Sequence, residues 1–190
     1  MQRIWVALAW VASAGAPASV ALAGDPAQTP RAALQRLDPQ PLWREVRPEV
    51  AAFQVGFPGD PSYTQQVHST WVGSIVEQRW AVERSDLHLE VLRYELPFLS
   101  TFVLSDASLV RRARDSLLED RGGRKLAWEP ARISERSGWT LRFEVPGPES
   151  RTEEARFLLA GRTLYILDAA PEGDGPGTLA KRFFSSFRLR

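Results

Sequence analysis

The sequence predicts an α+β fold, an antiparallel β-sheet of about six to seven strands flanked by helices. Three observations predict it. Short segments alternate apolar and polar residues, as half-buried strands do. Two other segments repeat apolar residues about every four positions, as helices do. Glycine- and proline-rich turns separate these segments, in the order three strands, a helix, four strands and a helix.

Residues 1–23 have the three parts of a signal peptide. Arg3 supplies positive charge, Ile4–Ala14 is an apolar run, and Ala21-Leu22-Ala23 presents small residues to a signal peptidase. An uncleaved membrane anchor is the alternative, because the charge-free stretch is just long enough to span a bilayer. A glycine and a proline interrupt it, so we expect cleavage after Ala23. The mature chain would then be periplasmic or secreted, by Gram-negative-type export, without a stable membrane anchor.

Residues 24–41 are rich in proline and read as a linker, so the folded domain is expected over 42–190. Removal of Arg3 would leave 23 basic against 23 acidic residues. This balance argues against a nucleic-acid partner and against strong attachment to anionic membranes. Cysteine is absent, which excludes disulfides and a lipoprotein anchor. The sequence does not indicate an oligomeric state.

The first strand is expected over 53–57, where Phe53, Val55 and Phe57 alternate with smaller or polar residues before a Pro-Gly-Asp-Pro turn. A second strand is expected over roughly 66–73.

A two-residue turn at Ser85-Asp86 would close the next hairpin. It would pair Val82 with Leu89 and Trp80 with Val91 on one face of the sheet. His88 would then lie opposite Glu83 on the other face. A strand is also expected to follow this turn, and it ends before the first helix.

That helix is expected from about residue 107 to 119, with Ser105 or Asp106 as its N-cap. Gly122-Gly123 would end it, since glycine adopts the left-handed conformation beyond a helix terminus. One apolar stripe runs along it: Leu109, Ala113 and Leu117.

The second half has the clearest alternation. Strands are expected over 125–133 and 139–145, and a turn at Gly161-Arg162 would join two more strands. Across that turn Phe157 and Leu159 would face Leu164 and Ile166. A last helix is expected over 178–187, with three apolar residues on one side: Leu179, Phe183 and Phe187.

Several short stretches over about residues 53–190 form a familiar series: "FQVGFPGDP", "VLRYELP", "ARDSLL" and "RFLLAGRTLYIL", followed by a glycine-rich loop and "KRFFSSFRL". Together they resemble the PsbP/Mog1-like α/β/α sandwich. The resemblance implies a mostly non-enzymatic family that includes a photosystem subunit, a binder of a small GTPase and exported bacterial proteins of unknown role. This chain resembles an exported bacterial member. The family has no shared catalytic motif, so no catalytic residues carry over.

Metal binding and nucleophilic catalysis both depend on the two histidines, His68 and His88. With Glu83 or Glu90 they could form an open metal site, but polar positions on sheet edges explain them more simply. A Ser–His–Asp arrangement stays open because triads assemble in space, yet no serine lies in a Gly-x-Ser-x-Gly motif. We therefore expect no catalytic residue, no metal and no cofactor.

Charged runs are expected to form solvated surfaces. Glu153-Glu154 lies between two arginines, as at a solvated strand start. The basic run from Arg111 to Lys125 contains acidic residues, and Arg111 can reach Asp115 one helical turn away. Glutamates around residues 77–90 alternate with arginines, which suggests cross-strand ion pairs of small energy.

Tryptophans supply the candidate binding residues. Trp80 and Trp139 occupy apolar faces and are expected in the core. Trp43 and Trp71 are less constrained, and exposed aromatic residues often anchor protein interfaces. Trp43 and Trp71 are therefore the predicted binding surface.

The leading hypothesis is an exported, non-enzymatic binding or assembly module of the cell envelope that recognises a protein partner. A periplasmic carrier of a small molecule or lipid is one alternative, motivated by the aromatic and leucine content. A hydrolase that uses His68 or His88 is the other.

Overall fold

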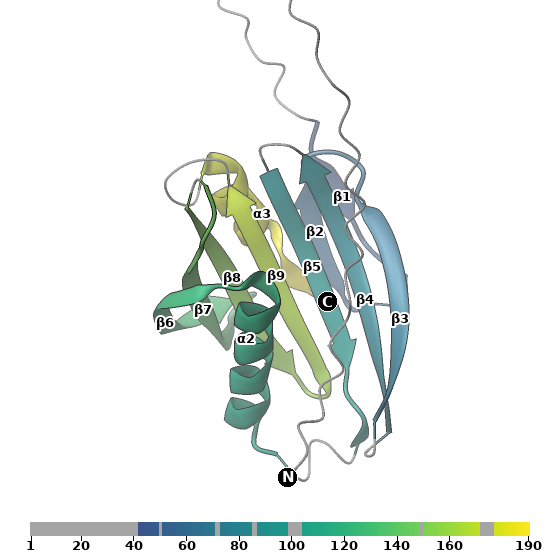
Figure 1. Cartoon of the computed structure of the whole chain (residues 1–190). Helices are drawn as coiled ribbons and strands as arrows, with labels where there is room; N and C mark the ends of the chain where they lie inside the picture. The colour runs from purple at the N-terminus through teal and green to yellow at the C-terminus, as the bar shows by residue number, and fades with distance from the viewer. Residues whose placement is uncertain are drawn as a thin grey trace, which may run out of the picture. The chain divides into compact units, whose positions relative to one another are not determined.

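A seven-stranded antiparallel sheet forms the centre of the fold, in the spatial order β3-β4-β5-β9-β8-β7-β6 (Figure 1). Its strands are β3 (Ser62–Thr70), β4 (Gly73–Arg84), β5 (Leu87–Glu95), β6 (Arg124–Ile133), β7 (Arg136–Val145), β8 (Arg151–Ala160) and β9 (Thr163–Pro171). The computed structural model describes residues 42–49, 51–70, 73–84, 87–98, 104–148, 150–171 and 177–190. The predicted leader and linker lie outside these residues. Within them no helix is long and apolar enough to cross a bilayer.

A second, three-stranded sheet consists of β1 (Arg44–Val46), β2 (Phe53–Phe57) and β10 (Arg188–Leu189), with β2 in the middle. The strand predicted over 53–57 is confirmed, and its alternate side chains Phe53, Val55 and Phe57 are fully buried. It belongs to this small sheet, whose short outer strands have too few residues to show a pattern in the sequence.

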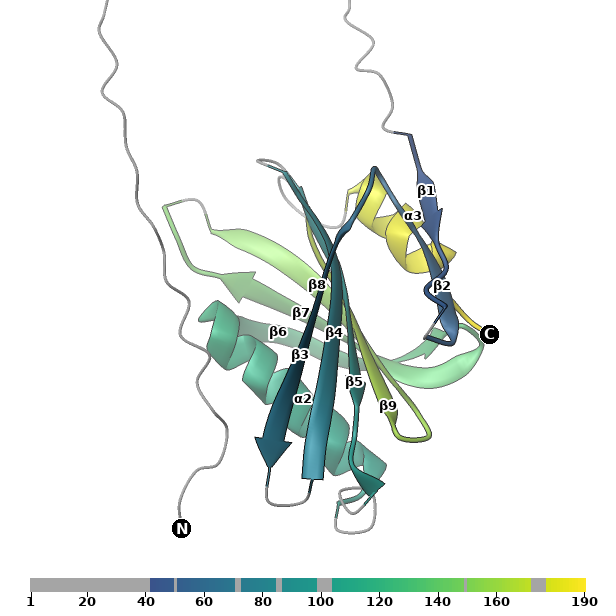
Figure 2. The same cartoon turned by 90° about the vertical axis from the view of Figure 1, so that its right-hand side faces the viewer.

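Two helices of the described chain, α2 (Asp106–Arg121) and α3 (Thr178–Ser186), cover opposite faces of the large sheet (Figure 2). We call these the α2 face and the α3 face. Side chains of β9 alternate between them: Tyr165 and Leu167 join the core of the α3 face, whereas Leu164 and Ile166 join the core of the α2 face. The small sheet packs on the α3 face beside α3. The predicted α+β sandwich is therefore confirmed.

Aromatic rings dominate the core of the α3 face. The ring of Phe53 lies 5.1 Å from that of Trp80, 5.8 Å from that of Tyr165 and 5.7 Å from that of Phe187. Phe53 thereby joins the small sheet to β4, to β9 and to the end of α3.

The predicted caps at the two ends of the first helix are confirmed. The Ser105 side chain accepts a hydrogen bond from the Ser108 N–H, and Gly122 adopts the left-handed conformation with φ of 59°. Gly122 donates its N–H to the carbonyl of Glu119. The helix runs two residues further than expected, to Arg121.

Both predicted hairpin registers are confirmed. Val82 pairs with Leu89, Trp80 with Val91 and Glu83 with His88. Phe157 pairs with Ile166 and Leu159 with Leu164, across a turn in which Gly161 has φ of 60°. The Ser85-Asp86 turn itself lies outside the described residues.

The second strand exists, but its predicted bounds of 66–73 are wrong. β3 ends at Thr70 and β4 begins at Gly73, so the segment contains the end of one strand and the start of the next. β3 is mostly solvent-exposed and polar, and it has no apolar alternation from which its extent could be predicted. For the same reason five strands, not three, precede α2 in the described chain.

Replacing Phe53 by alanine should remove the contacts that join the small sheet to the large one. We expect the free energy of unfolding to fall by roughly 3–5 kcal/mol, as for large aromatic side chains in well-packed cores. Chemical denaturation measures it. Leu42→Ala is the control, because Leu42 is 83% exposed, and it should change stability by less than about 0.5 kcal/mol. Equal effects of the two substitutions would contradict the packing described here.

Candidate functional site

Five charged or ionisable side chains lie together on the α2 face, at the C-terminal end of α2. We call them the buried charge cluster: Arg79 of β4, His88 and Glu90 of β5, Arg121 of α2 and Asp168 of β9. Strand alternation brings them together, because Glu90 lies directly opposite Asp168 in the β5–β9 register. Arg121 is the last residue of α2, so the length of that helix determines whether it reaches the cluster.

Arg121 is the central group. Its Nη2 atom lies 2.7 Å from Asp168 Oδ2, 3.0 Å from Glu90 Oε1 and 3.0 Å from His88 Nε2. Arg79 donates its Nε–H to the other Glu90 oxygen at 2.6 Å. Glu90 is thus held between two guanidinium groups, whereas Asp168 shares only one.

This difference separates the two acids. Burial raises the pKa of the Asp168 carboxyl to about 7, and the neighbouring Glu90 and Glu153 carboxylates add to the shift while Arg121 opposes it. Burial also acts to raise the pKa of Glu90, but His88, Arg121 and Arg79 together lower it to about 2. Glu90 is therefore ionised at neutral pH, whereas Asp168 holds its proton to a much higher pH than an ordinary aspartate.

Two carboxylate oxygens at the cluster have no hydrogen-bond partner among the described residues, Asp168 Oδ1 and Glu153 Oε2. Glu153 is fully buried, and its other oxygen accepts a bond from Arg151 Nε at 2.7 Å. The expectation of a solvated strand start is therefore wrong for Glu153. The residue shares the α2 face with Ala155 and Phe157, and this face of β8 is covered by α2.

The cluster has the residue types of a metal site but an arginine at its centre. Ligand atoms of His88, Glu90 and Asp168 lie within 4.8 Å of one another. Each of the three is within 3.0 Å of Arg121 Nη2, so the guanidinium supplies the positive charge that a metal ion would bring. The chemistry that the cluster supports is proton binding within an ion-pair network.

The two histidines do not meet. His68 lies on the edge strand β3, as expected, and its Nε2 is 3.0 Å from Glu77 Oε2. His88 lies on β5, an inner strand, and belongs to the buried charge cluster. Its assignment to a sheet edge is therefore wrong. The order of the strands in the sheet separates the two residues, and the sequence does not show this order.

A second candidate site is the outer edge of β3, one of the two outer strands of the large sheet, with which no other strand of the described residues pairs. Seven of its nine residues are exposed, and none is Asp, Glu, Lys, Arg or Pro. Tyr63 and Val67 are 49% and 60% exposed. Exposed edges are usually protected by charge, proline or a bulge. We call β3 the open edge.

The other outer strand, β6, has all three protections. It contains Arg124, Lys125 and Pro130, and its register with β7 shifts between Lys125 and Ala127. Both strands are outer strands of the same sheet. The difference in their protection against pairing therefore comes from their amino-acid sequences.

The predicted binding residues are only partly placed. Trp43 is half-buried against the core of the α3 face, with the Arg182 guanidinium 4.3 Å from the centre of its ring. Trp71 lies outside the described residues. Their role in binding stays a prediction.

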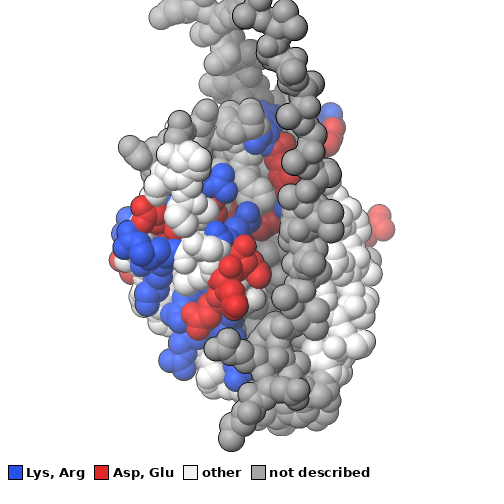
Figure 3. Space-filling model, in the orientation of Figure 1, with Lys and Arg blue, Asp and Glu red and all other residues white. Residues whose placement is uncertain are grey.

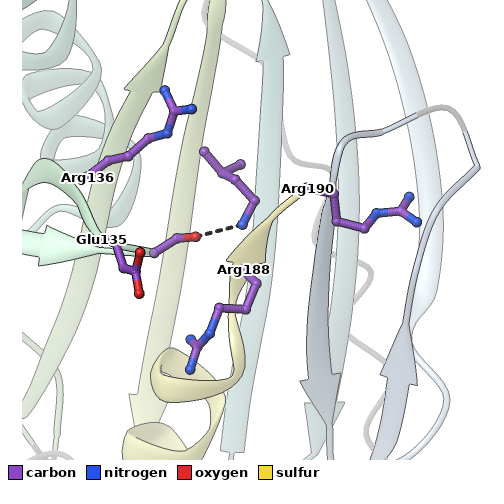
Figure 4. Close-up of a pocket in the computed structure, with 6 residues that line it drawn as sticks. Glu135, Arg136, Arg188 and Arg190 are labelled. Carbon is purple, nitrogen blue, oxygen red and sulfur yellow. Dashed lines mark hydrogen bonds between the residues drawn. The ribbon is translucent and has the colours of Figure 1, made fainter.

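A pocket of about 500 Å³ lies where the β6–β7 turn meets β10 (Figure 4). The Leu189 N–H donates to Ser134 Oγ at 2.7 Å and fastens the turn to β10. Arg188 donates to the carbonyls of Ser185 and Phe187, and Arg190 donates to that of Pro48. These arginines extend in different directions and bind backbone, so the pocket does not bring its polar groups to one point.

Charges on the exposed side of α2 are mixed in sign (Figure 3). Arg111, Arg112, Asp115 and Glu119 are all exposed there. This agrees with the solvated helix face that the sequence predicts. Asp115 forms its ion pair with Arg114 at 2.6 Å, which corrects the expected pairing with Arg111.

Comparison with known proteins identifies a solved structure with a similar fold. No family model matches the chain, and no curated protein matches it by sequence. The structure is similar to the solution structure of cyanobacterial PsbP (CyanoP) from Synechocystis sp. PCC 6803, with a TM-score of 0.53 and 14% sequence identity. The match covers 78% of this chain and 92% of that one. The chain therefore has a PsbP-like fold, as the sequence motifs predict.

Replacing Asp168 by asparagine should remove a pH dependence of stability. The folded state raises the pKa of Asp168, so its stabilising contribution is complete below the ordinary aspartate pKa of 3.8 and is lost as pH rises through about 7. Each rise of one pH unit in that window should lower the free energy of unfolding of the wild type by roughly 1 kcal/mol. Urea unfolding at about pH 5 and pH 8 should show the variant gaining relative to the wild type at the higher pH. Asp115→Asn on the helix surface is the control. A wild-type slope that persists in Asp168→Asn would contradict the raised pKa.

Replacing Arg121 by methionine should leave Glu90 and Asp168 without their shared cation. Breaking a buried ion pair on one side costs roughly 3–5 kcal/mol, because the remaining charge is buried and uncompensated. Thermal or chemical unfolding at neutral pH measures the loss. Arg111→Met, on the exposed side of the same helix, should cost less than about 0.5 kcal/mol. If the two variants lose the same amount, Arg121 does not hold the cluster together.

Proposed function

We propose that this chain with a PsbP-like fold is an exported, non-enzymatic binding and assembly module of the bacterial cell envelope. Its partner is another protein chain, which adds an extended strand to the open edge of β3. The observation that carries this proposal is the open edge itself. Such strand addition uses main-chain hydrogen bonds for affinity and alternate side chains for specificity.

The backbone of β3 is already arranged to receive a strand. Its pairing with β4 runs from Ser62 opposite Ala81 to Thr70 opposite Gly73 without a register shift. Nine residues of regular antiparallel strand span about 30 Å. The N–H and C=O groups that point away from β4 therefore form an uninterrupted row on the outer side of β3.

The side chains of β3 are partly fixed in place. The Tyr63 ring lies 5.1 Å from that of Trp80, and its hydroxyl donates to Gln65 Oε1 at 2.9 Å. Gln78 of β4 donates to the same Gln65 oxygen at 2.9 Å. A surface that is ordered before binding loses less conformational entropy when a partner arrives.

Export is supported by the signal-peptide pattern of residues 1–23. A non-enzymatic role is supported by the position of the most unusual acid, because Asp168 is fully buried and cannot touch a substrate. Among the described residues, neither histidine hydrogen-bonds to a serine or threonine hydroxyl, as the base of a triad would: His68 contacts Glu77, and His88 contacts Arg121. A hydrolase therefore has less support than a binding module.

A carrier also has less support. The space between α3 and the large sheet, where a ligand would lie, is occupied by side chains in contact. Phe183 of α3 and Leu167 of β9 belong to one core cluster there, and both are completely buried. Phe57 of the small sheet closes the same core, with its ring centre 5.3 Å from that of Phe183. Recognition at the surface fits this packing better than a ligand held inside.

The test is photo-crosslinking in the native envelope. A photoreactive residue at position 66 of β3 should give adducts with another protein chain, whereas one at position 129 of β6 should not, because β6 is a protected edge. Val67→Lys should lower the β3 adducts at least tenfold, roughly 1.4 kcal/mol of binding free energy. Leu126→Lys is the matched control, since Leu126 is an apolar residue of β6 with 47% exposure. Equal adducts at the two edges, or adducts unaffected by Val67→Lys, would exclude β3 as the binding element.

A further inference from the structure

We infer that the open edge of β3 pairs with β3 of a second copy of this chain, antiparallel and about a twofold axis at Gln65. This inference rests on the proposed function and names the partner of the same edge. It is carried by the spacing of side chains along β3, by the absence of charge from that strand, and by the fixed position of Tyr63.

The two most exposed apolar side chains of β3 are symmetrically placed about Gln65. Tyr63 precedes it by two positions and Val67 follows it by two. In an antiparallel pair centred at Gln65, Tyr63 of each copy lies opposite Val67 of the other. Aromatic and β-branched residues form favourable cross-strand pairs, and both exposed side chains of each copy become covered.

The faces of the two sheets agree in this register. Residues 63, 65 and 67 all project from the face that Tyr63 shares with Trp80, its partner in β4. A twofold axis perpendicular to the sheet keeps this face on the same side in both copies. Residues that lie opposite each other must therefore have numbers that differ by an even amount, as 63 and 67 do. The two seven-stranded sheets then continue into each other, and the interface is isologous, as in most homodimers.

Neighbouring registers fit less well. If the axis lay at Gln66, Tyr63 would face Ser69 and Val67 would face Gln65. If it lay at Thr64, Tyr63 would face Gln65 and Val67 would face Pro61. Only the register centred at Gln65 brings the two apolar side chains together.

Charge also favours a second copy at this edge and not at the other. A strand that pairs with itself meets its own charges, and like charges directly opposite each other are destabilising. From Ser62 to Thr70 there is no acidic or basic residue apart from His68, which would lie opposite Ser62. β6, in contrast, contains Arg124, Lys125 and Arg132, and self-pairing about residue 128 would place Arg124 of each copy opposite Arg132 of the other.

The size of the contact sets its strength. Two strands that meet edge to edge bury less than the roughly 800 Å² per partner of a standard stable interface. We therefore expect a dimer that dissociates on dilution, with a dissociation constant in the micromolar range. Association at this edge would also cover a strand that otherwise invites aggregation.

Sedimentation equilibrium of the purified protein tests the dimer. We expect a mass that rises from monomer to dimer with concentration, and a dissociation constant raised at least tenfold in Val67→Lys. Val67 is exposed, so this substitution should leave the folded domain intact, which the unfolding midpoint verifies. Leu126→Lys on β6 should dimerise like the wild type.

A cysteine scan tests the register, which is possible because the chain has no cysteine. Directly opposed residues in antiparallel strands have Cα atoms about 4.5–5.5 Å apart, within disulfide range. Gln65→Cys should therefore form a disulfide-linked dimer on mild oxidation. Gln66→Cys should form much less, because the two copies of residue 66 are offset along the strands. Preferential crosslinking at 66 would overturn the register.

The outcomes separate this inference from the proposed function. A monomer at every concentration up to about 1 mM overturns the dimer, as does a dimer that Val67→Lys leaves unchanged. If the chain is monomeric while position 66 still crosslinks a different protein in a way that Val67→Lys prevents, the proposed function stands without the dimer. If position 66 crosslinks no protein chain, both are overturned.

Discussion

The burial of β9 on both faces is the constraint on which the rest of the domain depends. One set of its side chains requires the cover of α3 and the small sheet, and the other set requires the cover of α2. Asp168 lies within this doubly buried strand, where an ionised carboxylate is costly unless a cation is close. Arg121 supplies that cation from the last turn of α2. The length and position of α2 are thus tied to an acid on the central strand, and α2 carries the charge as well as the apolar surface that β9 needs.

The same arrangement explains why β3 is left open. α3 packs on β9 and β2, and α2 packs on β8 and β7. β3 is at the opposite end of the strand order, and its main contacts are with β4. Most residues of β3 are polar because few of them are covered. They are also uncharged, and solubility alone does not require the absence of charge. An edge of this composition suits pairing with another strand, whereas β6 is protected against it.

Local patterns account for much of the fold that could be predicted. The capping serine binds a free N–H at the start of α2, and the glycine after α2 ends the helix. Both act on residues close to them in the chain, so their effect can be recognised in the sequence. Both hairpin registers follow from short turns and from which side chains must be buried together. The bounds of β3 were misplaced because an exposed strand carries little alternation, and β1 was missed because it has only three residues. The candidate site was missed for a different reason: Arg121 bonds to Glu90 and Asp168 across 31 and 47 positions. One clue was present, since a charged residue within the apolar run of β9 needs a partner if that strand is buried.

The sequence by itself determined which segments become strands and helices, where most of them end, and which of their faces are apolar. These properties depend on neighbours along the chain, through backbone conformation and the periodicity of side chains. Only the tertiary structure decided the order of the strands, and with it which strand lies at an edge and which is buried twice. That order placed His68 at the surface and His88 beside Arg121. Burial then determined the protonation of Asp168, because the free energy of a charge depends on the groups and solvent around it in space.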